Sequence, residues 1–119
     1  MMNQQEVFDK VVRHLLKQGE RAISDNGRCA YNDSHGRKCA VGCLITDEAY
    51  NPDIEHRAAD TTEVIWALKN SGIDVDWECG DDQLLLRLQG IHDTDLIDEW
   101  PSKLAEVAAA FNLTFPEDV

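Results

Sequence analysis

Four cysteines are the residues of this chain best suited to metal or redox chemistry: Cys29, Cys39, Cys43 and Cys79. If residues 39–45 form a helix, Cys39 and Cys43 lie one turn apart on the same face. Cys29, with either His35 or Cys79, could then complete a tetrahedral zinc site. The spacing lacks the paired Cys-x2-Cys knuckles of strong zinc motifs, and free cysteines are often buried as small apolar residues. Zinc binding and core packing therefore both stay open, and a disulfide or redox pair is a third interpretation that an intracellular setting disfavours.

An adjacent histidine and aspartate, His92 and Asp93, are the second candidate for chemistry. Metal-dependent phosphohydrolases use such a pair as ligands, but they also need further ligands from other helix positions. His14 and His56 are nominees for that role, and nothing in their spacing selects them. The alternative is that His92 lies at the end of a helix, where the helix dipole favours a histidine. The chain has no nucleophile elbow and no glycine-rich phosphate loop, so its sequence does not indicate catalysis.

The charge of the chain is strongly unbalanced. Eleven Lys and Arg stand against 23 Asp and Glu, which gives a formal net charge of −12. Seven of the basic groups lie in residues 1–38, so the acidic excess belongs to residues 39–119. Such a field repels phosphate, which argues against direct binding to nucleic acid or to an anionic membrane, and it attracts basic protein surfaces. The other reason for such a charge is solubility alone.

Two short windows concentrate the acidic residues. The first contains a tryptophan among five carboxylates: Asp74, Asp76, Trp77, Glu78, Asp81 and Asp82. The second contains four carboxylates: Asp93, Asp95, Asp98 and Glu99. If the fold brings both windows onto one face, they form a phosphate-like array that suits the basic groove of a nuclease or another nucleic-acid enzyme. Because tryptophan is also enriched at binding hot spots, we predict that these ten residues bind a protein partner.

The first helix is the clearest structural prediction. Asn3 and Glu6 form a capping-box pattern ahead of paired apolar residues that recur every four positions. Gly19 is placed to end this helix. The segment that follows is different, because residues 24–38 are rich in turn-forming residues and residues 28–31 are long enough for one strand of a small hairpin. Residues 38–45 are compact and apolar and could form a buried strand or the first turns of a helix, and their small residues Ala40 and Gly42 favour the helix.

Three further helices follow in the second half of the chain. The capping-box pattern of residues 60–63 opens a helix that runs to Gly72. The next helix starts at Asp81 or Asp82 and places its apolar residues on one face, and Pro101 starts the last helix. Trp66 and Trp100 are predicted to lie in the core or at its rim, and Trp77 is the better interface candidate.

These elements predict a mainly α fold. We expect a single domain over residues 1–119, with four to five helices around one core and a short hairpin-like, cysteine-bearing segment near residues 24–40. No apolar run approaches the roughly 18 residues that a membrane-spanning helix needs. The polar N-terminus does not resemble a signal peptide, so we expect a cytoplasmic protein.

Part of the sequence resembles a small family of proteins found in phage and prophage genomes. The resemblance rests on Cys29-Ala30-Tyr31, on residues 36–45 (Gly-Arg-Lys-Cys-Ala-Val-Gly-Cys-Leu-Ile), on Tyr50-Asn51-Pro52 and on residues 85–93 (Leu-Leu-Arg-Leu-Gln-Gly-Ile-His-Asp). It covers roughly residues 7–111. The resemblance implies a phage-type accessory protein and transfers no catalytic or binding residue, since that family has no established activity.

The sequence therefore predicts a phage-type accessory protein, without a cofactor, that binds an unidentified protein with a basic surface. An acidic inhibitor of a host defence enzyme or another nucleic-acid enzyme is the most specific form of this prediction. The alternatives are a small metal-dependent hydrolase that uses His92 and Asp93, and a module stabilised by zinc at the cysteines.

Overall fold

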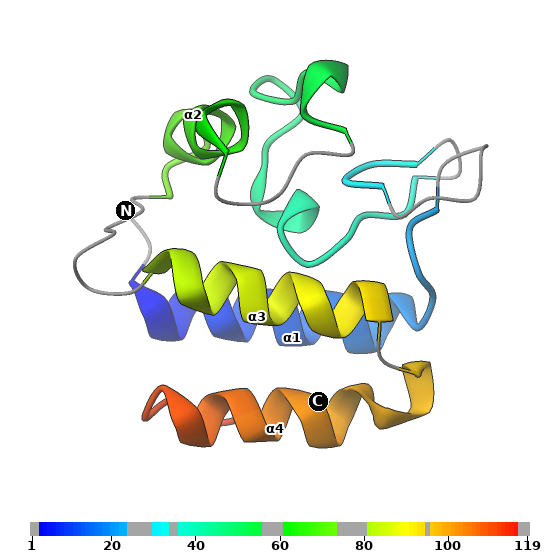
Figure 1. Ribbon diagram of the computed structural model, residues 1–119, viewed down its shortest axis with the longest axis vertical. Coiled ribbons are helices and arrows are strands. Elements are labelled where there is room, and N and C mark those ends of the chain that lie inside the picture. The colour runs from blue at the N-terminus through cyan, green and yellow to red at the C-terminus, as the bar shows by residue number, and fades with distance from the viewer. Residues whose placement is uncertain are drawn as a thin grey trace.

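A computed structural model describes residues 3–23, 30–33, 36–55, 61–73, 81–94 and 96–116, and all of their side chains except those of Asp81 and Asp82. Within these ranges the chain forms four α-helices and three short 3-10 helices, and no strand (Figure 1). The radius of gyration is 13.2 Å. A folded domain of this length is expected to have about 13.5 Å. The prediction of one compact, mainly helical unit with four to five helices is confirmed.

The first helix, α1 (Gln4–Gln18), begins and ends as its sequence predicts. Asn3 Oδ1 accepts a hydrogen bond from the Glu6 backbone N–H at 2.9 Å, and Glu6 Oε1 accepts one from the Asn3 N–H at 3.2 Å. This capping box satisfies two backbone donors that the first turn of a helix leaves without partners. Gly19 ends the helix in the left-handed conformation, with φ of 65°, which costs a glycine little.

Three helices pack against one another as a bundle: α1, α3 (Asp81–Thr94) and α4 (Trp100–Ala110). Figure 1 shows α3 in front of α1 and α4 beneath both. The predicted apolar face of α3 is confirmed, since Leu84, Leu85, Leu88 and Ile91 are all buried. Helix α4 begins at Trp100, one residue earlier than predicted, and Pro101 stands in its first turn, where a proline needs no hydrogen-bond partner.

A less regular part of the chain lies on the side of the bundle opposite α4 (Figure 1). We call residues 20–23, 30–33 and 36–55 the irregular layer. It contains η1 (Gly42–Leu44), which contacts α1, and η2 (Pro52–Ile54), which contacts α2 (Thr62–Asn70). The buried residues of this layer join those of the bundle in one hydrophobic core, among them Tyr31, Cys39, Val41, Leu44 and Ile54.

The structure corrects the prediction of a helix over residues 38–45. Only one helical turn forms, in which the Cys43 N–H donates to the Cys39 carbonyl at 3.0 Å, and η1 overlaps its end. The chain becomes extended again at Ile45. Gly42 allows a close approach within this path, because a Cβ atom there would lie 2.0 Å from the carbonyl oxygen of Tyr31. The segment therefore packs its backbone directly against another backbone segment.

The predicted hairpin-like turn is present in reduced form. Asn32 and Lys38 form a single antiparallel bridge, and the Asp33 N–H donates to the Arg37 carbonyl at 2.9 Å. Residues 24–29, which include part of the predicted strand, lie outside the described ranges. The bridge places Asn32 alongside Lys38, the residue that precedes Cys39.

Trp66 lies neither in the core nor among the partly buried residues at its rim, contrary to prediction. Its side chain is 62% exposed, whereas Trp100 is completely buried, as predicted. Helix α2 buries Val64, Ala67 and Leu68 instead. At about 100° per residue, Trp66 lies on the far side of the helix from Val64, so the helical period itself places it outward.

Candidate functional site

His92 lies at the centre of a buried hydrogen-bond network at the C-terminal end of α3. Its side chain is completely buried, and its ring stacks on Trp100 with a centroid separation of 5.8 Å. The backbone N–H of Ala22 lies 3.0 Å from Nε2, and Asp93 Oδ1 lies 2.7 Å from Nδ1. Both ring nitrogens are therefore engaged within the chain.

These partners determine the tautomer of His92. A backbone N–H can only donate, so Nε2 must accept and cannot carry the proton. The proton is then on Nδ1, which donates it to the carboxylate of Asp93. A histidine that binds metal needs a free lone pair on one nitrogen, and here the Ala22 amide occupies it. The arrangement is thus structural, and the hydrolase alternative would require the irregular layer to move away from His92.

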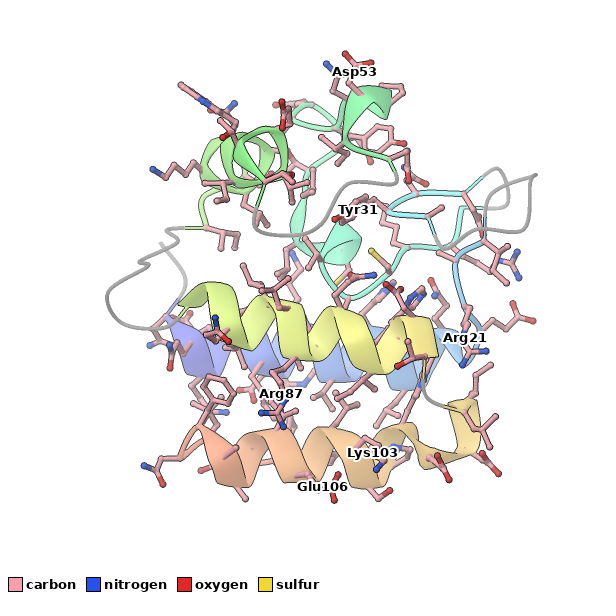
Figure 2. All side chains as sticks on the ribbon, in the orientation of Figure 1. Arg21, Tyr31, Asp53, Arg87, Lys103 and Glu106 are labelled. Atoms are coloured by element: carbon pink, nitrogen blue, oxygen red, sulfur yellow. The ribbon has the colours of Figure 1, made fainter. Side chains whose placement is uncertain are left out.

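Two further side chains extend the network into the irregular layer. Gln89 donates to Asp93 Oδ1 at 2.8 Å and accepts from the Val41 N–H at 3.1 Å. Arg21 donates from Nε to the His92 carbonyl at 2.9 Å, and Figure 2 shows Arg21 beside the C-terminal end of α3. Asp93, one of the predicted partner-binding residues, is thus part of an internal network that joins the bundle to the layer.

Cys39 and Cys43 pack within the irregular layer as thiols. The Cys39 sulfur is completely buried and accepts from the Gly42 N–H at 3.2 Å, while Cys43 Sγ donates to the Ala40 carbonyl at 3.0 Å. Burial raises the pKa of Cys39 far above its ordinary value, and it raises the pKa of Cys43 to about 12 against the opposing charges of Lys10 and Lys38. Both sulfur atoms therefore bond to backbone groups of their own turn, and zinc binding at the four cysteines stays a prediction.

Two carboxylates that sequence reasoning did not single out organise the irregular layer. Glu55 accepts from the backbone N–H groups of Tyr31 at 2.8 Å and Asn32 at 3.2 Å, and the Tyr50 hydroxyl donates to it. Burial and this carboxylate raise the pKa of Tyr50 well above its ordinary value. Asp33, whose side chain is fully buried, is the second of these carboxylates. It accepts from the Ile23 N–H at 3.2 Å and from both the backbone and the guanidinium of Arg37.

His14, one of the nominees for a metal site, is also engaged by the irregular layer. Its Nε2 lies 2.7 Å from the Lys38 carbonyl, to which it donates. Gln18, one turn along α1, accepts from the Lys38 N–H and donates to the same carbonyl, both at 2.9 Å. Burial lowers the pKa of His14, and the bond to Lys38 opposes that shift only partly. Helix α1 therefore contacts the irregular layer through side-chain hydrogen bonds to the backbone of Lys38.

The second acidic window ends in an exposed turn, η3 (Ile97–Glu99). Leu96 and Ile97 are 61% and 39% exposed, and Asp98 and Glu99 are exposed beside them. Trp100 follows directly and is completely buried, so it anchors the turn to the core. We call Leu96, Ile97, Asp98 and Glu99 the η3 corner. The apolar half of this corner was not predicted.

A groove lies between α2 and η2, away from the η3 corner (Figure 1). Its volume is about 290 Å3, and it is lined by Ala49, Asn51, Asp53, Ile54, Glu63, Trp66, Ala67 and Asn70. A different groove, between α3 and α4, is lined by Arg87, Lys103 and Glu106 among others, and Figure 2 shows these three side chains together. Among the described lining residues, the first groove has two carboxylates and no basic group, whereas the second has two basic groups and one carboxylate.

Several predicted site residues lie outside the described part of the chain. These are Cys29, Cys79, His35, His56, Asp74, Asp76, Trp77, Glu78 and Asp95. Asp81 and Asp82 start α3, as predicted, but their side chains are not described. The union of the two acidic windows on one face therefore stays a prediction.

The described residues contain neither a cluster of metal-ligating side chains nor a membrane-spanning helix. Over these ranges, no group of three or more histidine, cysteine, aspartate or glutamate side chains is arranged to hold a metal ion. Among the same residues, no helix has the length and apolarity to cross a membrane.

Comparison with known proteins does not identify the chain. No family model, no curated protein and no solved structure matches it. The resemblance to phage and prophage proteins therefore stays a prediction from the sequence patterns alone.

Proposed function

We propose that this chain is an accessory protein that acts by binding a basic surface of another protein, and that the η3 corner is part of its interface. The observation that carries the proposal is the exposure of Leu96 and Ile97 directly beside Asp98 and Glu99. Protein interfaces combine apolar contact with a charged rim, and large exposed side chains are normally scattered singly on a surface. Here one turn exposes two large apolar side chains that are adjacent in the sequence, Leu96 and Ile97.

The anchoring of the corner supports this use. Trp100 is buried against His92 immediately after Glu99 and fixes the position of the turn. A contact surface that is held in place before binding loses less conformational entropy when a partner docks. The corner is therefore better suited to binding than a freely moving acidic segment would be.

The charge of the chain supports a basic partner. At −12, the protein attracts positively charged surfaces at long range, and proteins that handle nucleic acid carry such surfaces. The partner class that fits is a nuclease or other nucleic-acid enzyme, such as a component of host defence against phage. This role would place the protein in the cytoplasm of the host cell.

The test is a kinetic measurement on the partner that the wild-type chain captures. Opposed charges speed association and are screened by salt, so the association rate should fall as salt rises from about 50 to 500 mM. Asp98→Asn/Glu99→Gln should slow association, and Leu96→Ser should speed dissociation. The triple variant Asp74→Asn/Asp76→Asn/Asp82→Asn extends the test to the first acidic window.

Asp47→Asn/Glu48→Gln is the matched control. It removes an adjacent exposed aspartate and glutamate at another place, and the single contact it breaks is an exposed pair with Lys38, which contributes little. Binding that ignores salt and responds equally to both double variants would overturn the proposal. The acidic charge would then serve solubility alone.

A further inference from the structure

The exposed side of α4 is built from small residues. This helix lies at the edge of the bundle, on the side away from the irregular layer (Figure 1). Ser102, Ala105 and Ala109 are exposed and are spaced as i, i+3 and i+7, so they share one face of the helix. Side chains of this size let the axis of a second helix approach closely. The exposed side of α4 therefore offers a close-packing face for another helix.

The groove between α3 and α4 runs beside this face. Its volume is about 340 Å3, and the buried side chains of Ile91 and Val107 give it an apolar floor. Arg87 places a positive charge on the α3 wall and Lys103 places one on the α4 wall, as Figure 2 shows. Lys103 lies 3.7 Å from Glu106 in an exposed ion pair, which contributes little. An apolar floor between two cations suits a segment that combines apolar and acidic side chains.

Gly90 leaves open space in this groove. A Cβ atom at that position would meet nothing within 4 Å, so packing within the chain does not require a glycine there. Glycine in the middle of a helix is less stable than alanine, because it loses more conformational entropy on folding. A group of another molecule that approaches the backbone of α3 at this point would account for the glycine.

We infer that a second copy of the chain binds here, with the η3 corner of each copy in the α3–α4 groove of the other. The corner has the composition that complements the groove, because it joins two exposed apolar side chains to two exposed carboxylates: Leu96, Ile97, Asp98 and Glu99. The apolar pair contacts the floor of the groove, and the carboxylates pair with Arg87 and Lys103.

The two contacts can form together across a two-fold axis. The corner directly precedes α4, and the α4 wall of the groove lies at residues 103–107. At a rise of about 1.5 Å per residue, the wall is roughly 6–12 Å further along the helix. Two α4 helices that lie antiparallel, with the two-fold axis near Ser102, therefore bring each corner to the other copy's groove. Such an interface is self-complementary and closes after two copies.

This inference goes beyond the proposed function, because it needs no second protein. A corner that is held by a second copy is also not available to a basic partner surface, so the two forms of binding exclude each other. The purified chain tests the inference by itself. Failure of dimerisation would leave the proposed binding of a partner untouched, and failure to capture a partner would leave the dimer untouched.

The experiment is sedimentation velocity on the purified chain at about 150 mM salt. At this ionic strength the Debye length is about 8 Å, so distant acidic groups of the two copies are screened while touching pairs are not. Between about 10 μM and 1 mM protein, the average mass should rise from one chain toward two, as for a small and weak interface. In NMR spectra over the same range, amide signals of residues 96–99 and 102–109 should shift, and those of α2 should not.

An exchange of charges tests the pairing directly. Arg87→Glu/Lys103→Glu, the groove variant, places acidic groups against the acidic corner. Asp98→Lys/Glu99→Lys, the corner variant, places basic groups against the basic groove. Each variant alone should lose at least about tenfold in dimer affinity, because like charges then face each other in both contacts. None of the four positions is buried, so both variants should keep the fold. In an equimolar mixture both contacts regain opposite charges, and a heterodimer should form.

Asp47→Lys/Glu48→Lys is the matched control for the corner variant. It changes the net charge by the same amount at another exposed place, so it should dimerise like the wild-type chain. Mixed with the groove variant, it leaves one of the two contacts repulsive, and the heterodimer should be weaker than the one that the corner variant forms.

A chain that stays monomeric at the highest concentration would overturn the inference. A dimer that neither charge reversal weakens would do the same. Equal association of the groove variant with the control and with the corner variant would also overturn it, since net charge alone would then explain the rescue. Concentration-dependent shifts confined to α2 would place the contact on another surface, which is equally incompatible with the inference.

Discussion

Among the described residues, the buried side chains of the three-helix bundle are apolar apart from His92, whereas in the irregular layer a buried carboxylate, Asp33, and a partly buried one, Glu55, bind the backbone. The bundle satisfies its backbone through helical hydrogen bonds and is stabilised by burying leucine, valine and aromatic side chains. The described part of the layer has no strand and little helix, so its N–H groups need other acceptors. Glu55 and Asp33 supply them.

The difference shows that two kinds of interaction stabilise the packing around one core: apolar contacts and hydrogen bonds from backbone N–H groups to carboxylates. Apolar packing is distributed over many residues, and each contributes in proportion to the area that it buries, so the largest buried side chains contribute most. Carboxylate anchors concentrate the stability of a segment in one or two side chains, because an unsatisfied buried amide is costly. The layer should therefore lose its structure through single polar substitutions, and the bundle through single apolar ones.

The largest effect should come from the bundle, with Trp100→Ala. This substitution removes a completely buried indole that stacks on His92, and such truncations cost about 3–5 kcal/mol. Urea denaturation measures the change in unfolding free energy. Trp66→Ala is the control and should cost less than about 1 kcal/mol, because its side chain is mostly exposed. Equal costs for the two would contradict the assignment of Trp100 to the core.

The next largest effect should come from the layer, with Glu55→Gln. The amide keeps the size of the side chain but cannot accept in the same way from Tyr31, Asn32 and Tyr50 together, so we expect a loss of about 1–3 kcal/mol. Hydrogen exchange should show lower protection in the layer and unchanged protection in α4. Glu48→Gln, at an exposed position, should stay within about 0.5 kcal/mol. Uniform loss of protection would show that the two regions unfold together.

The cysteines should behave as small apolar residues. Cys39→Ala and Cys43→Ala should each cost about 1 kcal/mol, the scale of a small deletion in a core. A chelator should leave the melting temperature unchanged, and elemental analysis should find no stoichiometric metal. Bound zinc, or a melting temperature that collapses with chelator, would instead make the layer a zinc-stabilised module.

The smallest effect is a pH dependence carried by His14. Its pKa is lowered in the folded chain, mainly by burial, while the unfolded value stays near 6.5. The unfolded state therefore binds the proton first, so the stabilising contribution is complete above about pH 6.5 and is lost as the pH falls. In His14→Gln this acid loss should be reduced, as measured by denaturation between about pH 5 and 7. An identical pH profile in both proteins would contradict the assignment.

The sequence was most informative for helices whose caps and apolar periodicity lie within the helix and its flanking residues. The caps of α1 at Asn3 and Gly19 and the buried face of α3 were predictable, because helical periodicity and capping are local. Trp66 could have been placed correctly by the same rule, since it lies on the far side of α2 from Val64. A tryptophan favours burial by its type, but its position on α2 turns it outward, and position decides.

The irregular layer could not be predicted in the same way. Glu55 binds amides 24 and 23 residues away, and no sequence pattern links a carboxylate to distant backbone groups. The exposure of Leu96 and Ile97 has the same origin, because it depends on how Trp100 anchors the turn. The sequence predicts His92 at the end of a helix. Its buried hydrogen bond to the Ala22 N–H could not be predicted, because it depends on how the irregular layer packs against α3.

The close approach at Gly42 has a consequence for how such a chain can diverge. A Cβ atom at that position would meet the Tyr31 carbonyl oxygen at 2.0 Å, so even alanine requires the backbone to move. Apolar positions of the bundle can exchange leucine for isoleucine or methionine at small cost. No such conservative substitution exists for Gly42, because every other residue type has a Cβ atom. Diverged chains that keep this fold should therefore vary widely in their helices and still carry glycine there, which makes that residue a marker for recognising distant relatives.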